Sequence, residues 1–239
     1  MAFSGTYDFA LDILELTEEA YQRCGLEVRA GDQLRSARRS LDLLLTSWAN
    51  EQVNLWTLDQ ASLDLVDGTA SYTISSPALD ILDAVVNDTD NYDSPMTRIS
   101  IEEYLKRPDK TSEGRPTHYA VERNTNTLTL YLYPVPDDST LDFLYWRIRY
   151  IQDAGVYSNN AEVPRRFLPA LTSGLAWYVA NKNPAKLVHD PAGNIVEVDG
   201  VGFQRRQELL QQYGMDLEKA KDEDRDRSSM YILPDRVRI

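Results

Sequence analysis

Apolar residues in the first 50 positions recur every three or four residues, which is the spacing of one face of an α-helix. One such stripe runs from Tyr7 to Cys24 between charged side chains, and Gly25 supplies a natural helix end. A second stripe begins after Asp32, a favourable N-cap residue, and continues to about Asn50. Because the linker between the stripes is short, the pattern predicts an antiparallel pair of helices.

The spacing of apolar residues changes to two after this helix pair, and such alternation predicts β-strands. Asp67-Gly68 predicts a turn, and Ser100 with Glu103 forms the capping-box pattern that starts a short helix. The segment 140–150 carries large apolar side chains on both faces, which is typical of a strand covered on both sides or closed into a small barrel. The predicted strands lie within residues 53–65, 72–74, 81–86, 96–99, 118–123, 128–133 and 140–150.

Helical spacing returns at Val163-Pro164 and ends at Asn183-Pro184. Turn-forming residues follow at 189–194, and a last helix is predicted from about Phe203 to about Asp226. We therefore predict an α+β chain in which an antiparallel four-helix bundle carries an inserted antiparallel β domain, built as a small barrel or a sandwich. The predicted divisions are the first helix pair at 1–52, the β domain at 53–150, the second helix pair at 151–227 and an extended C-terminal arm at 228–239.

The C-terminal arm is rich in apolar residues although no later element remains for them to pack on. Pro234 prevents the last helix from continuing through it, so the arm is expected to be extended. Exposed apolar segments of this kind usually mark an interface with another protein. The alternative is an arm that folds back on its own core or frays as a terminus.

The charge balance limits the kinds of partner. Asp and Glu number 38 against 25 Lys and Arg, which gives a net charge of -13 and argues against a protein that binds nucleic acid by neutralising phosphates. The single cysteine, Cys24, cannot form an internal disulfide, and no Cys/His spacing matches a zinc site. Neither a signal-peptide pattern nor a membrane-spanning run occurs, so we expect no export and no membrane anchoring.

Few residues are candidates for catalysis. Cys24 occupies an apolar helical position, where an inert buried thiol is expected, and His118 and His189 lack the spacing of metal ligands. No glycine motif for a nucleophile elbow, a phosphate or a dinucleotide occurs. Paired carboxylates could hydrolyse a glycan, but the adjacent acids are better explained as turn and helix-start residues. These acids are Asp137-Asp138 and Glu102-Glu103. We predict no catalytic residue, no metal and no cofactor.

The arrangement as a whole resembles a known family, the head-to-tail adaptors of tailed bacteriophages, especially the podovirus head-completion or packaged-DNA-stabilisation proteins. The similarity spans most of the chain. It is carried by Tyr21-Gln22-Arg23-Cys24-Gly25-Leu26, Ala37-Arg38-Arg39-Ser40-Leu41 through Leu44-Leu45-Thr46-Ser47-Trp48, Leu55-Trp56, Val163-Pro164, Phe167 into Leu175-Ala176-Trp177-Tyr178, and Asp224-Arg225-Asp226-Arg227-Ser228-Ser229.

This resemblance implies a structural virion protein that forms a ring, typically of twelve copies, between the portal protein and the tail at the head–tail junction. It also implies that the ring is assembled in the host cytoplasm, and that DNA passes through its acidic bore without sequence-specific binding. In this family the C-terminal arm reaches the portal. The implied portal-binding residues are Met230, Tyr231, Ile232, Leu233, Pro234, Arg236, Val237, Arg238 and Ile239.

Two polar loops of the β domain, 87–95 and 106–116, are candidates for contacting the tail tube or nozzle, with ordinary solvent-exposed loops as the alternative. The candidate tail-binding residues are Asp90, Asn91, Tyr92, Asp93, Arg107, Lys110 and Arg115. Two other functions stay open at this point. One is a cell-wall glycan hydrolase of the virion, and the other is a β domain that binds a carbohydrate or protein ligand.

Overall fold

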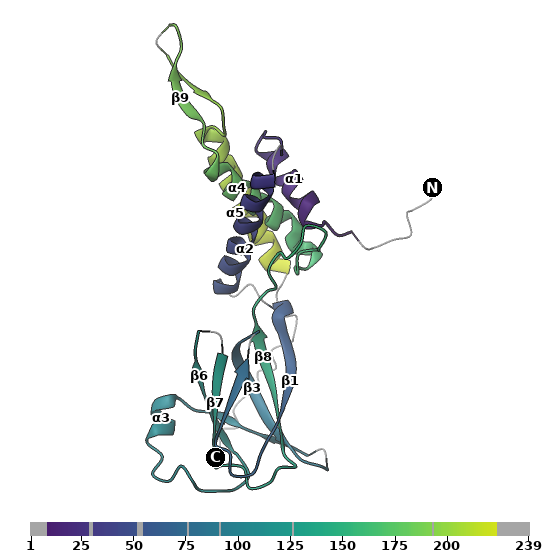
Figure 1. The fold of residues 1–239 in the computed structure, drawn as a ribbon, viewed down its shortest axis with the longest axis vertical. Coiled ribbons are helices and arrows are strands. Elements are labelled where there is room, and N and C mark those ends of the chain that lie inside the picture. The colour runs from purple at the N-terminus through teal and green to yellow at the C-terminus, as the bar shows by residue number, and fades with distance from the viewer. Residues whose placement is uncertain are drawn as a thin grey trace, which may run out of the picture. The chain divides into compact units, whose positions relative to one another are not determined.

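The computed structural model of the chain describes residues 9–28, 31–51, 55–75, 77–90, 92–125, 127–192 and 194–223. The chain divides into two compact units with boundaries after Ser47 and after Gln152. The helical unit combines the N-terminal and C-terminal parts of the chain, and the β unit is Trp48–Gln152 (Figure 1).

Long helices occur where the apolar spacing predicts them. The helical unit contains α1 (Ile13–Arg23), most of α2 (Gly31–Asn50), η2 (Arg165–Phe167), α4 (Leu168–Lys182) and α5 (Phe203–Glu223). α1 begins at a complete capping box, since the Asp12 carboxylate accepts a hydrogen bond from the Glu15 amide at 2.7 Å and the Glu15 carboxylate accepts one from the Asp12 amide at 3.3 Å. It ends where Gly25 takes a left-handed φ of 74°.

The helical unit is not the antiparallel four-helix bundle that we predicted. Such a bundle needs each helix to bury one stripe on a shared axis, whereas α4 is buried around most of its circumference and itself takes the central place. α1 and α5 both pack on α4, and a Cβ atom on Gly174 would lie 2.9 Å from side-chain atoms of both Leu44 in α2 and Tyr213 in α5. The α+β class is retained, with five α-helices and three sheets among the described residues.

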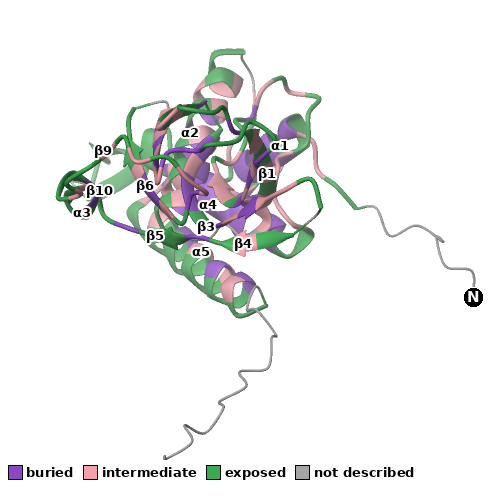
Figure 2. Ribbon diagram, turned by 90° about the horizontal axis from the view of Figure 1, so that it is seen from below, coloured by how far each residue is buried: buried purple, intermediate pink, exposed green. Residues whose placement is uncertain are grey.

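A β-hairpin connects α4 to α5, in a stretch where the sequence predicted turns. Its strands are β9 (Lys186–His189) and β10 (Ile195–Val198), which pair antiparallel with Val188 opposite Val196. All eight strand residues are exposed (Figure 2). The hairpin extends beyond the helices at the end of the unit where α4 stops and α5 starts (Figure 1).

The β unit holds two four-stranded sheets, with strand orders β1-β8-β3-β4 and β2-β7-β6-β5. All neighbouring strands of these two sheets are antiparallel except β5 and β6, which pair in parallel with Thr97 opposite His118. The prediction of a purely antiparallel β domain is therefore wrong for this pair. The elements are η1 (Leu55–Thr57), β1 (Leu58–Asp64), β2 (Ser71–Ser75), β3 (Ala78–Asn87), β4 (Asp93–Pro95), β5 (Thr97–Arg98), α3 (Ile101–Leu105), β6 (His118–Arg123), β7 (Thr127–Tyr133) and β8 (Asp142–Arg149).

One hydrophobic core joins the two sheets face to face, as in a sandwich. Phe143 of β8 and Tyr119 of β6 meet edge to face in it, with ring centroids 5.8 Å apart. The opposite face of β8 is only partly covered, because Trp146 is 49% exposed. The expectation of a strand covered on both sides is therefore wrong at this residue.

Candidate functional site

The residues with reactive side chains have structural surroundings. The Cys24 thiol donates a hydrogen bond to the Ala176 carbonyl at 3.1 Å, and burial raises its pKa to about 11, so it is protonated at neutral pH. His118 lies 2.8 Å from the Thr117 hydroxyl, and His189 is exposed on the hairpin. Within the described ranges, no three His, Cys, Asp or Glu side chains gather as metal ligands.

The adjacent acids considered for glycan hydrolysis also have local roles. Glu102 and Glu103 lie in the first turn of α3 and form ion pairs with Lys106 and Arg107, four residues further along. The Asp138 carboxylate accepts a hydrogen bond from the Thr140 amide at 2.8 Å, as is usual in a turn. This arrangement supports turn and helix-start roles for these acids.

Arg115 joins the two loops predicted to contact the tail. Its guanidinium forms an ion pair with Asp88 at 3.0 Å and donates hydrogen bonds to the Val86 and Tyr92 carbonyls at 3.3 and 3.2 Å. Asp88 in turn accepts hydrogen bonds from the amides of Asp90 and Tyr92. The Tyr92 amide and the Arg115 guanidinium hold the pKa of the Asp88 carboxyl below its usual value. The β3–β4 loop and the end of the α3–β6 loop therefore form one surface, here called the β tip.

The other residues predicted to contact the tail have either structural contacts or exposed side chains. Arg107 lies over the Tyr133 ring, with its guanidinium carbon 5.0 Å from the ring centroid. Lys110 donates hydrogen bonds to the backbone carbonyls of Leu105, at the end of α3, and of Arg107. Asp93 accepts a hydrogen bond from the Asn87 side chain at 2.7 Å. Tyr92 is 67% exposed and Asp90 is also exposed, so these two remain available to a partner. Asn91 lies outside the described residues.

The predicted portal-binding residues 230–239 also lie outside the described residues. The structure does define where the described part of the last helix runs. α5 contacts η2 as well as α4, and η2 carries Arg165 and Arg166.

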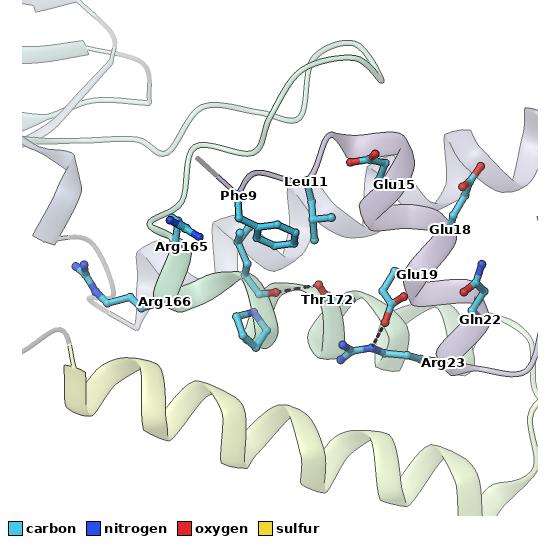
Figure 3. Close-up of a pocket in the computed structure, with 12 residues that line it drawn as sticks. Phe9, Leu11, Glu15, Glu18, Glu19, Gln22, Arg23, Arg165, Arg166 and Thr172 are labelled. Carbon is cyan, nitrogen blue, oxygen red and sulfur yellow. Dashed lines mark hydrogen bonds and ion pairs between the residues drawn. The ribbon is translucent and has the colours of Figure 1, made fainter. Parts of the chain in front are cut away.

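A groove of about 770 Å³ lies between α1 and the η2–α4 junction, and no sequence pattern had pointed to it (Figure 3). Phe9, Leu168 and Pro169 give it an apolar lining, and the Arg165 guanidinium lies 6.0 Å from the centroid of the Phe9 ring. We call it the α1–η2 groove. Its lining residues are Phe9, Leu11, Glu15, Glu18, Glu19, Gln22, Arg23, Arg165, Arg166, Leu168, Pro169 and Thr172.

The two sides of the α1–η2 groove carry opposite charges. α1 contributes Glu15, Glu18 and Glu19, while η2 contributes Arg165 and Arg166 (Figure 3). Glu19 forms an ion pair with Arg23 of the same helix at 2.9 Å. Glu18 is exposed and makes no hydrogen bond or ion pair with another described residue. An apolar floor between an acidic and a basic side suits a peptide segment with charges of both signs.

The β9–β10 hairpin presents apolar side chains on both faces. Val188 and Val196 pair directly and so share one face of the hairpin. Ile195 pairs with His189, which is on the same face as Leu187, so Leu187 and Ile195 share the other face. Leu187 is 67% and Ile195 is 64% exposed. The sequence does contain a signal for this hairpin, because the apolar pairs Leu187-Val188 and Ile195-Val196 flank the turn formers at 190–194.

None of the helices in the described parts of the chain is long and apolar enough to cross a membrane.

No match was found among curated proteins. The family model of the SU10 adaptor protein matches residues 13–238, which is nearly the whole chain. This match confirms the resemblance to phage head-to-tail adaptors. It identifies the chain as a structural component of the virion that interacts with other head or tail proteins, and not as a member of a known enzyme family. The chain belongs to the SU10 adaptor protein family.

Proposed function

We propose that this adaptor forms a ring of twelve copies between the portal and the tail, extends the DNA channel, and docks on the portal through residues 230–239. The observation that carries the proposal is the family match, which reaches residue 238 and so includes all but the last residue of this arm. The composition of the arm supports it as well. The apolar run Met230-Tyr231-Ile232-Leu233 is followed by Arg236 and Arg238, which suits an extended segment inserted into pockets with an acidic rim.

Repetition makes such a contact strong. Each arm can anchor only a few apolar side chains, but the arms of one ring are held together and bind as a set. The net charge of -13 suits the channel role, because a wall rich in carboxylates repels phosphate and lets DNA slide without being held.

The β tip is the proposed contact with the tail tube or nozzle. Arg115 fixes the two loops to each other, and Tyr92 and Asp90 are left exposed on that fixed surface. An exposed tyrosine on a pre-organised loop is a favourable anchor, since little conformational entropy is lost when it binds.

Truncation tests the portal contact. A chain ending at Ser229 is expected to keep its fold and lose binding to isolated portal rings, measured by co-sedimentation and electron microscopy. Replacing Ile232 and Leu233 with serine in the full chain is expected to have most of the same effect, because apolar anchors dominate such contacts. The matched control replaces Ser228 and Ser229 with alanine and is expected to bind like the wild type. Full portal binding by the truncated chain would contradict the proposal.

Substitution at the β tip tests the tail contact separately. Tyr92→Ala is expected to leave assembly on the portal unchanged and to weaken attachment of purified tails about tenfold or more, as truncation of an aromatic anchor does. Thr73→Ala, at an exposed position of β2, is the matched control. Equal tail attachment by the wild type and Tyr92→Ala would remove the β tip from the interface.

A further inference from the structure

The β9–β10 hairpin is a structure that needs a partner. An isolated two-stranded hairpin is at best marginally stable in water, and this one exposes apolar side chains on both of its faces. Covering one face with its own helices would still leave the other in water. Exposed apolar surface of this kind on a folded unit marks a contact with another protein.

The hairpin is fixed to the helical unit at its base, and Asp190 accepts local hydrogen bonds at its tip. The Glu197 carboxylate accepts a hydrogen bond from the Phe203 amide at 3.0 Å, at the start of α5. At the tip, Asp190 accepts hydrogen bonds from the amides of Ala192 and Asn194 at 2.9 and 2.8 Å. The strands therefore present both apolar faces in a defined position, as a pre-organised binding element does.

Its charge favours a second copy of this chain as the partner. Two copies that each carry a net charge of -13 repel each other, so they can meet only where the local charge is low or complementary. The eight strand residues include one Lys and one Glu and are close to neutral. Lys186 stands at the base of β9, and Asp190 follows its other end at the tip.

The α1–η2 groove has the complementary features on the same unit. Its floor is apolar, its α1 side is acidic and its η2 side is basic. We propose that the β9–β10 hairpin of one copy lies in the α1–η2 groove of the next copy, with Leu187 and Ile195 on the apolar floor. Lys186 then faces Glu15 and Glu18, and Asp190 faces Arg165 and Arg166. A projection on one surface and a recess on another make a head-to-tail contact, which is the kind that closes rings. This inference rests on the proposed ring and names the contact between its copies.

Cross-linking between two variants tests the contact directly. Leu187→Cys and Glu18→Cys are made in separate chains, mixed, and treated with a short bismaleimide, both in concentrated solution and on portal rings. Cys24 does not interfere, because it is buried and its thiol stays protonated. A cross-linked dimer is expected in the mixture and not with either variant alone. Val66→Cys, at a turn of the β unit that is 51% exposed, replaces Leu187→Cys in the control mixture.

Two further variants test the chemistry of the contact. Leu187→Ser with Ile195→Ser is expected to weaken association of copies about tenfold or more, whereas Val66→Ser leaves it unchanged. Glu18→Lys is expected to weaken association, and Lys186→Glu in the neighbouring copy is expected to restore it.

The outcomes separate this inference from the proposed function. Rings that assemble on the portal without the cross-link, and without loss in the double serine variant, would overturn the hairpin contact alone. A cross-link in concentrated solution without any binding to portal rings would support the hairpin contact and overturn portal docking. Absence of both would overturn both.

Discussion

Charged side chains of the β unit show how residues that suggest binding can have structural roles. Arg115 and Arg107 are predicted to meet the tail, and in the structure Arg115 joins two loops and Arg107 packs on an aromatic ring. Arg147 and Arg149 lie on the same face of β8 as the buried aromatic residues. Their Nε atoms are 2.7 and 3.7 Å from carboxylate oxygens of Asp59. The type of a charged residue and its position in the sequence therefore do not reveal its contacts within the fold.

Arg115→Ala is expected to loosen the β tip. The variant loses the ion pair to Asp88 and two hydrogen bonds to backbone carbonyls, so backbone amides of the β3–β4 loop should exchange several-fold faster. Hydrogen exchange read by mass spectrometry measures this. Lys106→Ala removes an ion pair between two exposed side chains and is expected to leave exchange in that loop unchanged. Equal exchange in the wild type and Arg115→Ala would contradict the joining role.

Asp59 gives a prediction about pH. The hydrogen bond from Arg147 holds the pKa of the Asp59 carboxyl below its ordinary 3.8 in the folded chain. A lowered folded-state pKa adds stability that is present above about pH 4 and is lost as the pH falls through the folded-state value. Asp59→Asn is thus expected to lower the free energy of unfolding by about 1 kcal/mol at pH 7, a small figure because the pair is partly exposed.

Denaturant unfolding at pH 7 and pH 3 checks this expectation, and the deficit of Asp59→Asn should shrink at the lower pH. Asp64→Asn, an exposed position at the end of the same strand, is the matched control and should stay close to the wild type at both values. A deficit of Asp59→Asn that is equal at pH 7 and pH 3 would count against the ion pair.

At the scale of elements, periodicity located the long helices but not their packing. The pattern gave α4 an apolar stripe, and a stripe on each of four helices suggested a bundle. In the structure, the residues of α4 are mostly small or apolar, and they are buried on nearly all sides of the helix. α4 therefore occupies the centre of the unit, which in a four-helix bundle is filled by side chains alone. Apolar spacing tells which residues avoid water. It does not tell which helix the others surround, because that depends on contacts far apart in the sequence.

Short elements were less predictable for a different reason. The strands of the β9–β10 hairpin have four residues each and no core beneath them, so alternation has little length in which to show. The α1–η2 groove was missed because it joins residues about 150 positions apart. The family resemblance, in contrast, came from the order of elements along the whole chain, and it was confirmed.

Gly174 tests the central place of α4. A side chain there would meet Leu44 and Tyr213 within 2.9 Å, so Gly174→Val is expected to destabilise the helical unit by about 1–3 kcal/mol through overpacking. Gly214→Ala is the matched change in α5, where an added Cβ meets nothing within 4 Å. It is expected to stabilise the chain by about 0.5–1 kcal/mol through helix propensity. Thermal unfolding measures both, and a neutral Gly174→Val would show that α2 and α5 do not press on α4.

At the scale of the whole molecule, each unit has its own buried core. The β unit encloses side chains from both of its sheets, and the helical unit encloses α4. Residues 53–150, produced alone, are expected to unfold cooperatively and to show fixed aromatic signals in near-UV circular dichroism. Leu130→Ala in that fragment removes a fully buried side chain and should lower its stability by about 2–5 kcal/mol. A fragment without a cooperative transition would mean that the sandwich depends on the rest of the chain.

The length of α5 sets a mechanical relation between the two proposed contacts of the helical unit. This helix has 21 residues and is therefore about 31 Å long. The hairpin precedes its first turn and is tied to it through Glu197, and the helix ends in the sequence before the predicted arm at 228–239. In the proposed ring, α5 has a fixed length. Binding of each hairpin to the next copy therefore also fixes where the C-terminal end of α5 lies along the ring axis. The regular spacing of the copies would then give a regular spacing of the C-terminal ends of α5, all at the same distance from the portal.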